Sequence, residues 1–99
     1  MTNLLAGAEL IGGKSMVSRT LATEAGLRVV LFHFAPGHEL AAHRAPMAIS
    51  IQILAGEGEL LRGGEWLPVV SGSLLVLPAN EEHGVRATTA MTMLLTMAR

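Results

Sequence analysis

Two histidines, His43 and His83, lie in settings typical of metal-binding or ligand-binding sites. His43 follows Gly37 and precedes Gly56, and His83 follows Gly72. A neutral imidazole is a common ligand of divalent transition metals, and it also orients bound organic molecules by hydrogen bonding. Two histidines do not complete a metal site. Any further ligands must come from other segments that the fold brings close.

The segments between the turn residues are short and apolar, and the glycines and prolines recur roughly every 8–12 residues, a spacing typical of many short strands. The predicted strands are residues 27–34, 48–54, 73–77 and 91–97, together with a hairpin of 59–62 and 65–67 about Gly63-Gly64. No stretch combines a helical period with helix caps. The sequence therefore predicts a single all-β domain over residues 1–99, built as a sandwich or barrel.

The segments around His43 and His83, with their flanking glycines and proline, resemble the two motifs of the cupin superfamily. These motifs read G-x5-H-x-H-x3-4-E-x6-G and G-x5-P-x-G-x2-H-x3-N. Below, His43 and His83 are called the two framed histidines. The positions that fit are Gly37, His43 and Gly56 in the first motif, and Gly72, Pro78 and His83 in the second. Asn80 stands where the family usually has glycine. The resemblance implies a small jelly-roll β-barrel, the double-stranded β-helix of single-domain cupins.

Besides Asn80, the chain departs from these motifs at three positions that matter for the site. In the family, three histidines and one carboxylate hold iron, manganese, nickel, copper or zinc. Here Ala45 occupies the position of the second histidine, Ile49 that of the glutamate and Ala87 that of the closing asparagine. Catalytic metal sites usually keep three protein ligands. The resemblance therefore implies the cupin fold with a degenerate metal motif.

Two other histidines could complete the site. His33 lies at the end of the strand before the first motif, and His38 lies in the connection that follows it. Either could approach His43 and His83 and make a three- or four-histidine site. In the competing interpretation, His33 is a hydrogen-bonded strand residue and His38 an exposed loop residue. Met47 is a weaker candidate ligand, because methionine more often fills irregular space.

We expect a small cupin that binds a small organic molecule in the barrel, with a divalent metal held weakly by the two framed histidines. The predicted ligand-binding residues are His43, His83, Met47, Ile49 and Ile51. One alternative is a metal-dependent enzyme, a dioxygenase, isomerase or lyase, whose site is completed by His33 or His38. A second alternative is a metal-free module for dimerisation or regulation. The sequence leaves open whether the protein is an enzyme.

The composition predicts a homodimer. Hydrophobic residues make up 51% of the chain and charged residues 15%, against an average of about 25% charged residues. A small domain cannot hide so much apolar surface internally, so we expect part of it to be covered by a second copy. Residues 1–5 or 91–97 are the candidate segments for this contact.

The charge pattern argues against nucleic-acid binding. Seven lysines and arginines and a net charge of −1 form no basic stripe. No apolar run reaches the ~20 residues of a membrane-spanning helix, and no signal peptide is evident. We therefore expect a cytoplasmic protein that does not bind membranes. There is no cysteine, which excludes disulfides and thiolate metal ligands.

Overall fold

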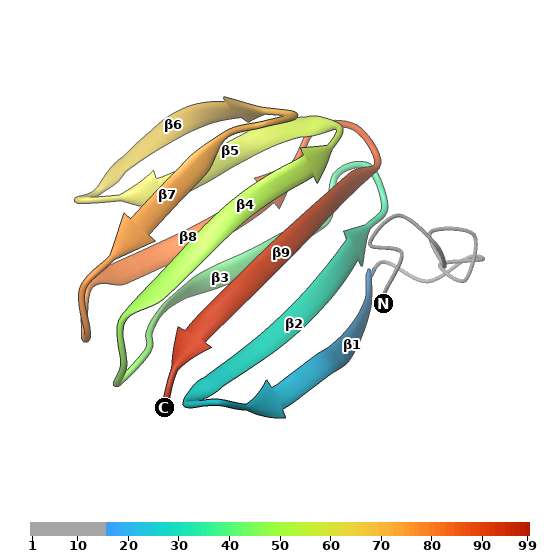
Figure 1. Ribbon diagram of the computed structural model, residues 1–99. Helices are drawn as coiled ribbons and strands as arrows, with labels where there is room; N and C mark the ends of the chain where they lie inside the picture. Colours follow the sequence, from blue (N-terminus) through green and yellow to red (C-terminus); the bar gives the residue numbers. More distant parts are fainter. Residues whose placement is uncertain (1–15) are drawn as a thin grey trace.

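The structure, a computed structural model, describes residues 16–99 as two antiparallel sheets that face each other (Figure 1). The strands are Met16–Glu24 (β1), Leu27–Phe34 (β2), Glu39–Arg44 (β3), Ile49–Ala55 (β4), Glu57–Arg62 (β5), Glu65–Val70 (β6), Leu74–Leu77 (β7), Glu82–Ala87 (β8) and Met91–Ala98 (β9). The five-stranded sheet has the order β1-β2-β9-β4-β7, and the four-stranded sheet has the order β3-β8-β5-β6. The predicted all-β jelly roll is confirmed.

The core lies between the two sheets, and β4 shows how the sequence specifies it. Ile49, Ile51 and Ile53 are 4%, 1% and 0% exposed, whereas Gln52 between them is exposed. Successive side chains of a strand point to opposite faces, so this alternation puts all three isoleucines inside. Each buried isoleucine contributes about 1.5–3 kcal/mol relative to an exposed one. The strand predicted over residues 48–54 is confirmed.

The hairpin predicted about Gly63-Gly64 is also confirmed. β5 pairs with β6 in a register that ends at Arg62 opposite Glu65, with the two glycines as the turn. Their φ angles are 59° and 77°. Positive φ at both central residues is the requirement of a type I′ turn, the turn whose twist matches antiparallel strands.

The last strand is central and does not lie at an edge of its sheet. β9 lies between β2 and β4 and pairs with both, so neither of its edges is free to pair with a second copy. Pairing of residues 91–97 with a second copy therefore cannot use a free edge of this strand, and their part in dimerisation stays a prediction; residues 1–5 lie outside the described part. Among residues 16–99, no helix has the length and hydrophobicity needed to cross a membrane.

Gly56, the closing glycine of the first motif, lies where two strands meet closely. Its φ is +82°, and a Cβ atom at this position would collide with the carbonyl oxygen of Ala90 and lie 2.9 Å from Cα of Met91. Gly26 has a similar φ of +74°, but a Cβ atom there would meet nothing within 4 Å. The two glycines therefore separate the effect of backbone conformation from the effect of close approach.

We predict that Gly56→Ala destabilises the fold more than Gly26→Ala does. Gly26→Ala should cost about 1–2 kcal/mol through its left-handed conformation alone. Gly56→Ala should add the cost of overpacking, typically about 1–3 kcal/mol. Urea denaturation of both variants measures the difference. Equal losses of stability would mean that the strands near Ala90 can move apart without cost.

Candidate functional site

A β-bulge in β3 brings His43 beside His83. Leu40 pairs with Val85 and His43 pairs with His83, so three steps along β3 match two along β8. Without the extra residue, Leu40 and His43 would point to opposite faces, because their separation is odd. Leu40 packs against the core. The bulge therefore turns His43 to the same, inward face.

The two imidazoles are in contact at the end of the barrel where the β3–β4 and β7–β8 connections lie, at the left of Figure 1. Their ring centroids are 4.3 Å apart and the ring planes are tilted by 58°. His83 is 4% exposed and shares its face with Val85 of the core, whereas His43 is exposed. The pair therefore has one buried and one solvent-accessible member, as expected at the mouth of a barrel.

Both rings are oriented by backbone carbonyl groups. Nδ1 of His43 lies 3.0 Å from the carbonyl oxygen of Ala41, and Nδ1 of His83 lies 3.0 Å from that of Glu81. A carbonyl oxygen can only accept, so Nδ1 of each ring carries a hydrogen and donates it. This tautomer leaves the lone pair of each Nε2 available to a metal ion or a hydrogen-bond donor.

The connection that precedes His83 is tied to the end of β3. Arg44 Nη1 donates to the carbonyl oxygen of Asn80 at 2.6 Å, and the amide of Asn80 donates to the carbonyl oxygen of Ala45 at 2.7 Å. Asn80 has a φ of 67°. Asparagine is among the few residues other than glycine that adopt this conformation at low cost, which explains its presence at a glycine position of the motif. These bonds hold the two histidine-bearing strands together at the mouth.

Arg62 is a third member of the mouth that the sequence analysis did not identify. Arg62 of β5 pairs directly with His83 of β8. It has the same strand parity as the buried Leu60, so its side chain starts from the inward face. Its side chain is 38% exposed, and Nε donates to Oε1 of Glu81 at 2.8 Å. A half-exposed ion pair contributes at most about 1 kcal/mol. Its relevance is that Arg62 lies opposite His83 in the sheet and binds Glu81, the residue whose carbonyl oxygen orients the His83 ring.

At the two motif positions where the family has a second histidine and a glutamate, this chain has side chains that pack in the core. Ala45 packs against the core and Ile49 belongs to it. Of the other predicted ligand-binding residues, Ile51 is buried in the core and Met47 is half-buried against it. The structure thus brings together His43 and His83, and it gives Ile49 and Ile51 a packing role.

His33 and His38 lie away from the pair. His33 points to the opposite face of its sheet from Phe32 and Phe34, whose stacked rings face the core, and its Nδ1 lies 3.0 Å from the hydroxyl of Thr92. His38 stacks on Phe34, with ring centroids 5.8 Å apart, at the far end of β3 from His43. Neither histidine approaches the pair, so the interpretation of His33 as a hydrogen-bonded strand residue agrees with its place.

The donors at the mouth fit a two-histidine metal site and do not fit a complete catalytic centre. Two neutral imidazoles with available Nε2 atoms suit a divalent transition metal. Within residues 16–99, however, no three histidine or acidic side chains form a group that could hold a metal ion. A metal held by the pair would therefore take its remaining ligands from water or from a bound molecule.

Structural relatives agree with this architecture. An RmlC-like cupin protein from Desulfovibrio desulfuricans is 32% identical with a TM-score of 0.86, and the match covers 99% of this chain and 95% of that one. A protein of unknown function from Streptococcus pyogenes is also 32% identical, with a TM-score of 0.77 over 85% of this chain and 74% of that one.

A more distant likeness shows the fold alone. The salicylate 1,2-dioxygenase of Pseudoaminobacter salicylatoxidans, in adducts with gentisate, is 16% identical with a TM-score of 0.81. The match covers 86% of this chain and 25% of the dioxygenase.

No curated protein matches the chain. The family model of the cupin domain matches residues 30–98, most of the chain. Together with the jelly-roll topology and the two framed histidines, this match shows that the chain belongs to the cupin family.

Proposed function

We propose that this cupin binds a small organic molecule at the mouth of its barrel through a divalent transition metal held by His43 and His83. The observation that carries the proposal is that Nδ1 of each ring lies 3.0 Å from a backbone carbonyl oxygen. Both Nδ1 atoms donate to backbone carbonyl groups, so two neighbouring Nε2 atoms present lone pairs. Nickel, copper, zinc, iron and manganese are the candidate ions.

The separation of the rings supports binding of one ion by both histidines. Metal–imidazole bonds are about 2.0–2.1 Å long for zinc, and ring centroids 4.3 Å apart allow both rings to contact a single ion. Each ring is anchored by a hydrogen bond at its other nitrogen, the arrangement that orients histidine ligands in metal sites. The exposure of His43 leaves the site open to solvent.

The same geometry favours binding over catalysis. With Ala45 and Ile49 in place of two ligands, the protein supplies too few donors for a tight or fully shaped centre. An organic molecule with two oxygen donors would complete the coordination of a weakly held ion. The guanidinium of Arg62 keeps donors beyond its bond to Glu81, and it could hold an oxygen of that molecule.

Metal binding tests the first half of the proposal. Protein stripped with a chelator should bind nickel at one site per chain, with an affinity that His83→Ala lowers by at least about tenfold, since even an outer-shell partner contributes about 10–100-fold. Isothermal titration calorimetry measures both values. His38→Gln is the matched control, because this histidine lies away from the pair, and it should leave the affinity unchanged.

Two results would contradict this half of the proposal. One is the absence of stoichiometric binding by a correctly folded protein. The other is a loss of affinity in His38→Gln as large as that in His83→Ala, which would mean that a different set of histidines holds the metal. Circular dichroism of each variant separates a lost ligand from a lost fold.

Binding of an organic chelator tests the second half. The visible spectrum of cobalt-loaded protein should change on addition of salicylate, which offers two oxygen donors to one ion. Benzoate, a monocarboxylate without the hydroxyl group, should cause a smaller change at the same concentration. His83→Ala should abolish both effects. Identical responses to the two acids would argue against a chelated ligand.

A further inference from the structure

Among residues 16–99, one edge strand has fewer of the usual protections against pairing than the other three. In residues 16–99, β1, β7, β3 and β6 are the strands with a single neighbour. Natural proteins protect such edges with charges, prolines, bulges or covering segments, because the free N–H and C=O groups of an edge can pair with another chain. The four edges differ in which of these features they carry.

Three of the edges carry protective features. β1 has a register irregularity after Thr20 and two charged residues, Arg19 and Glu24. β3 contains the bulge beside His43 and is charged at both ends. β6 carries Pro68 in its middle, a residue that has no N–H group for a further ladder. These features make pairing along β1, β3 or β6 unfavourable.

Within residues 16–99, β7 carries no charge, internal proline or bulge, and its one protective feature is its length of four residues. Its sequence is Leu-Leu-Val-Leu, and residues 66–80 around it contain no charged residue. Leu74 and Val76 are 64% and 61% exposed on its outer face, and Val70 beside it is 55% exposed. Three of the four large hydrophobic side chains that are exposed in residues 16–99 therefore lie on or next to this edge.

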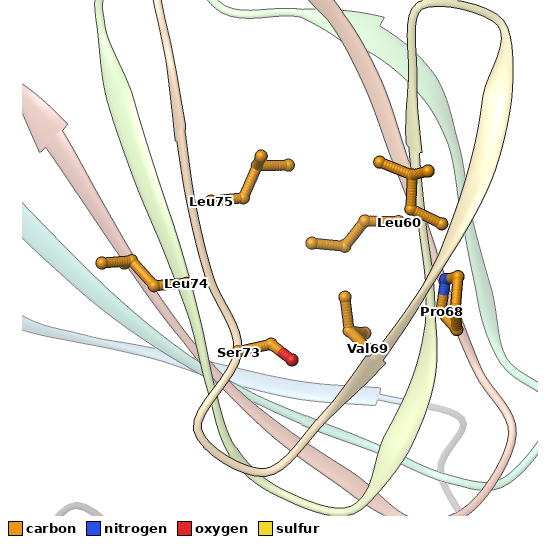
Figure 2. Close-up of a pocket in the computed structure, with 7 residues that line it drawn as sticks. Leu60, Pro68, Val69, Ser73, Leu74 and Leu75 are labelled. Carbon is orange, nitrogen blue, oxygen red and sulfur yellow. The ribbon is translucent and has the colours of Figure 1, made fainter.

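An apolar cavity adjoins the same edge. It has a volume of about 260 Å³ and lies between β7 and the β5–β6 hairpin, with Leu60, Leu67, Pro68, Val69, Ser73, Leu74 and Leu75 as its lining. Figure 2 shows Leu75 turned toward Val69 and Leu60, and Leu74 turned away on the other side of β7. A strand added to β7 would therefore meet apolar side chains on both of its faces.

We propose that β7 pairs antiparallel with β7 of a second copy of this chain, centred on Leu75, and joins two five-stranded sheets into one. Paired residues of antiparallel strands must share a face, and with Leu75 opposite its own copy each Leu74 lies opposite a Val76. This register covers both exposed side chains of the outer face. On the inner face, the two Leu75 side chains meet beside the cavity.

The absence of charge favours a second copy over a different partner. A two-fold contact places residues near their own copies, so any charge close to the axis would face a like charge. The uncharged run of residues 66–80 avoids that repulsion. It also offers no charged group with which an acidic or basic partner could be selected.

The four residues of β7 alone are too few for a standard interface, so the apolar side chains around the cavity must be buried as well. A standard interface buries about 800 Å² per partner, which is roughly a seventh of the 5513 Å² surface of this chain. A paired strand of four residues is only about 13 Å long. The rim formed by Leu67 and Pro68, covered by the partner's strand, extends the apolar contact beyond the strand itself. This interface is separate from the histidine pair and does not depend on the proposed metal site.

Sedimentation velocity of lysine variants tests the proposal. The wild-type chain should sediment at micromolar concentration as a dimer of about twice 10.4 kDa. The double variant Leu74→Lys, Val76→Lys should be a monomer over the same range, a loss of at least about tenfold in association from apposed like charges. Leu27→Lys, at a hydrophobic residue that is 43% exposed on β2, is the control and should remain dimeric. A monomeric wild type, or a dimer that survives in the double variant, would overturn the proposal.

Cross-linking tests the register independently. The chain has no cysteine, so Leu75→Cys introduces a single thiol on the proposed two-fold axis. Directly opposed residues have Cβ atoms about 4.5–5.5 Å apart, close enough for a disulfide after a small adjustment. Mild oxidation should convert Leu75→Cys to a covalent dimer and leave Leu27→Cys as a monomer on a non-reducing gel. Equal cross-linking of the two variants would exclude this register.

Discussion

The pairing of β8 with β3 on one side and β5 on the other is the constraint on which the candidate site depends. This double register places His43, His83 and Arg62 in one row across three strands. His83 and Arg62 face inward by the parity of their own strands, and His43 joins them because the bulge in β3 adds one residue between Leu40 and His43. The bulge is therefore what brings the two imidazoles together, since without it His43 would point away from His83.

The chemistry of the mouth follows from what occupies the other motif positions. Ala45 and Ile49 pack into the core at positions where the family's motif has ligands. This packing strengthens the barrel and removes two donors from the site. The remaining imidazoles are well oriented by backbone carbonyl groups and partly open to solvent. Such a pair suits reversible binding of an ion together with its organic ligand.

Local patterns in the sequence predicted much of the fold. The isoleucine alternation of β4 and the Gly63-Gly64 turn are local properties, so the sequence alone was sufficient for them. The mixed and largely polar surface of β1 has no clear period, and that strand was not predicted. β9 was recognised as a strand, but its central place depends on the order of strands, which no local pattern specifies.

The site was harder to predict because it depends on long-range register. The motif spacing identified His43 and His83, but the bulge that unites them is visible only when both strands are paired. Parity within the predicted hairpin puts Arg62 on the face of Leu60, yet only the pairing of β5 with β8 brings it to His83. Parity with the neighbouring Phe32 and Phe34 could have shown that His33 faces away from the core.

X-ray absorption spectroscopy of nickel-loaded protein would decide whether the histidine pair holds the metal, because it counts the imidazole ligands of the ion. We expect two imidazoles per nickel, with the remaining ligands being oxygen atoms of water or of an added organic chelator. A first coordination shell with three or more imidazoles would contradict it, because within residues 16–99 only two histidines meet at the mouth.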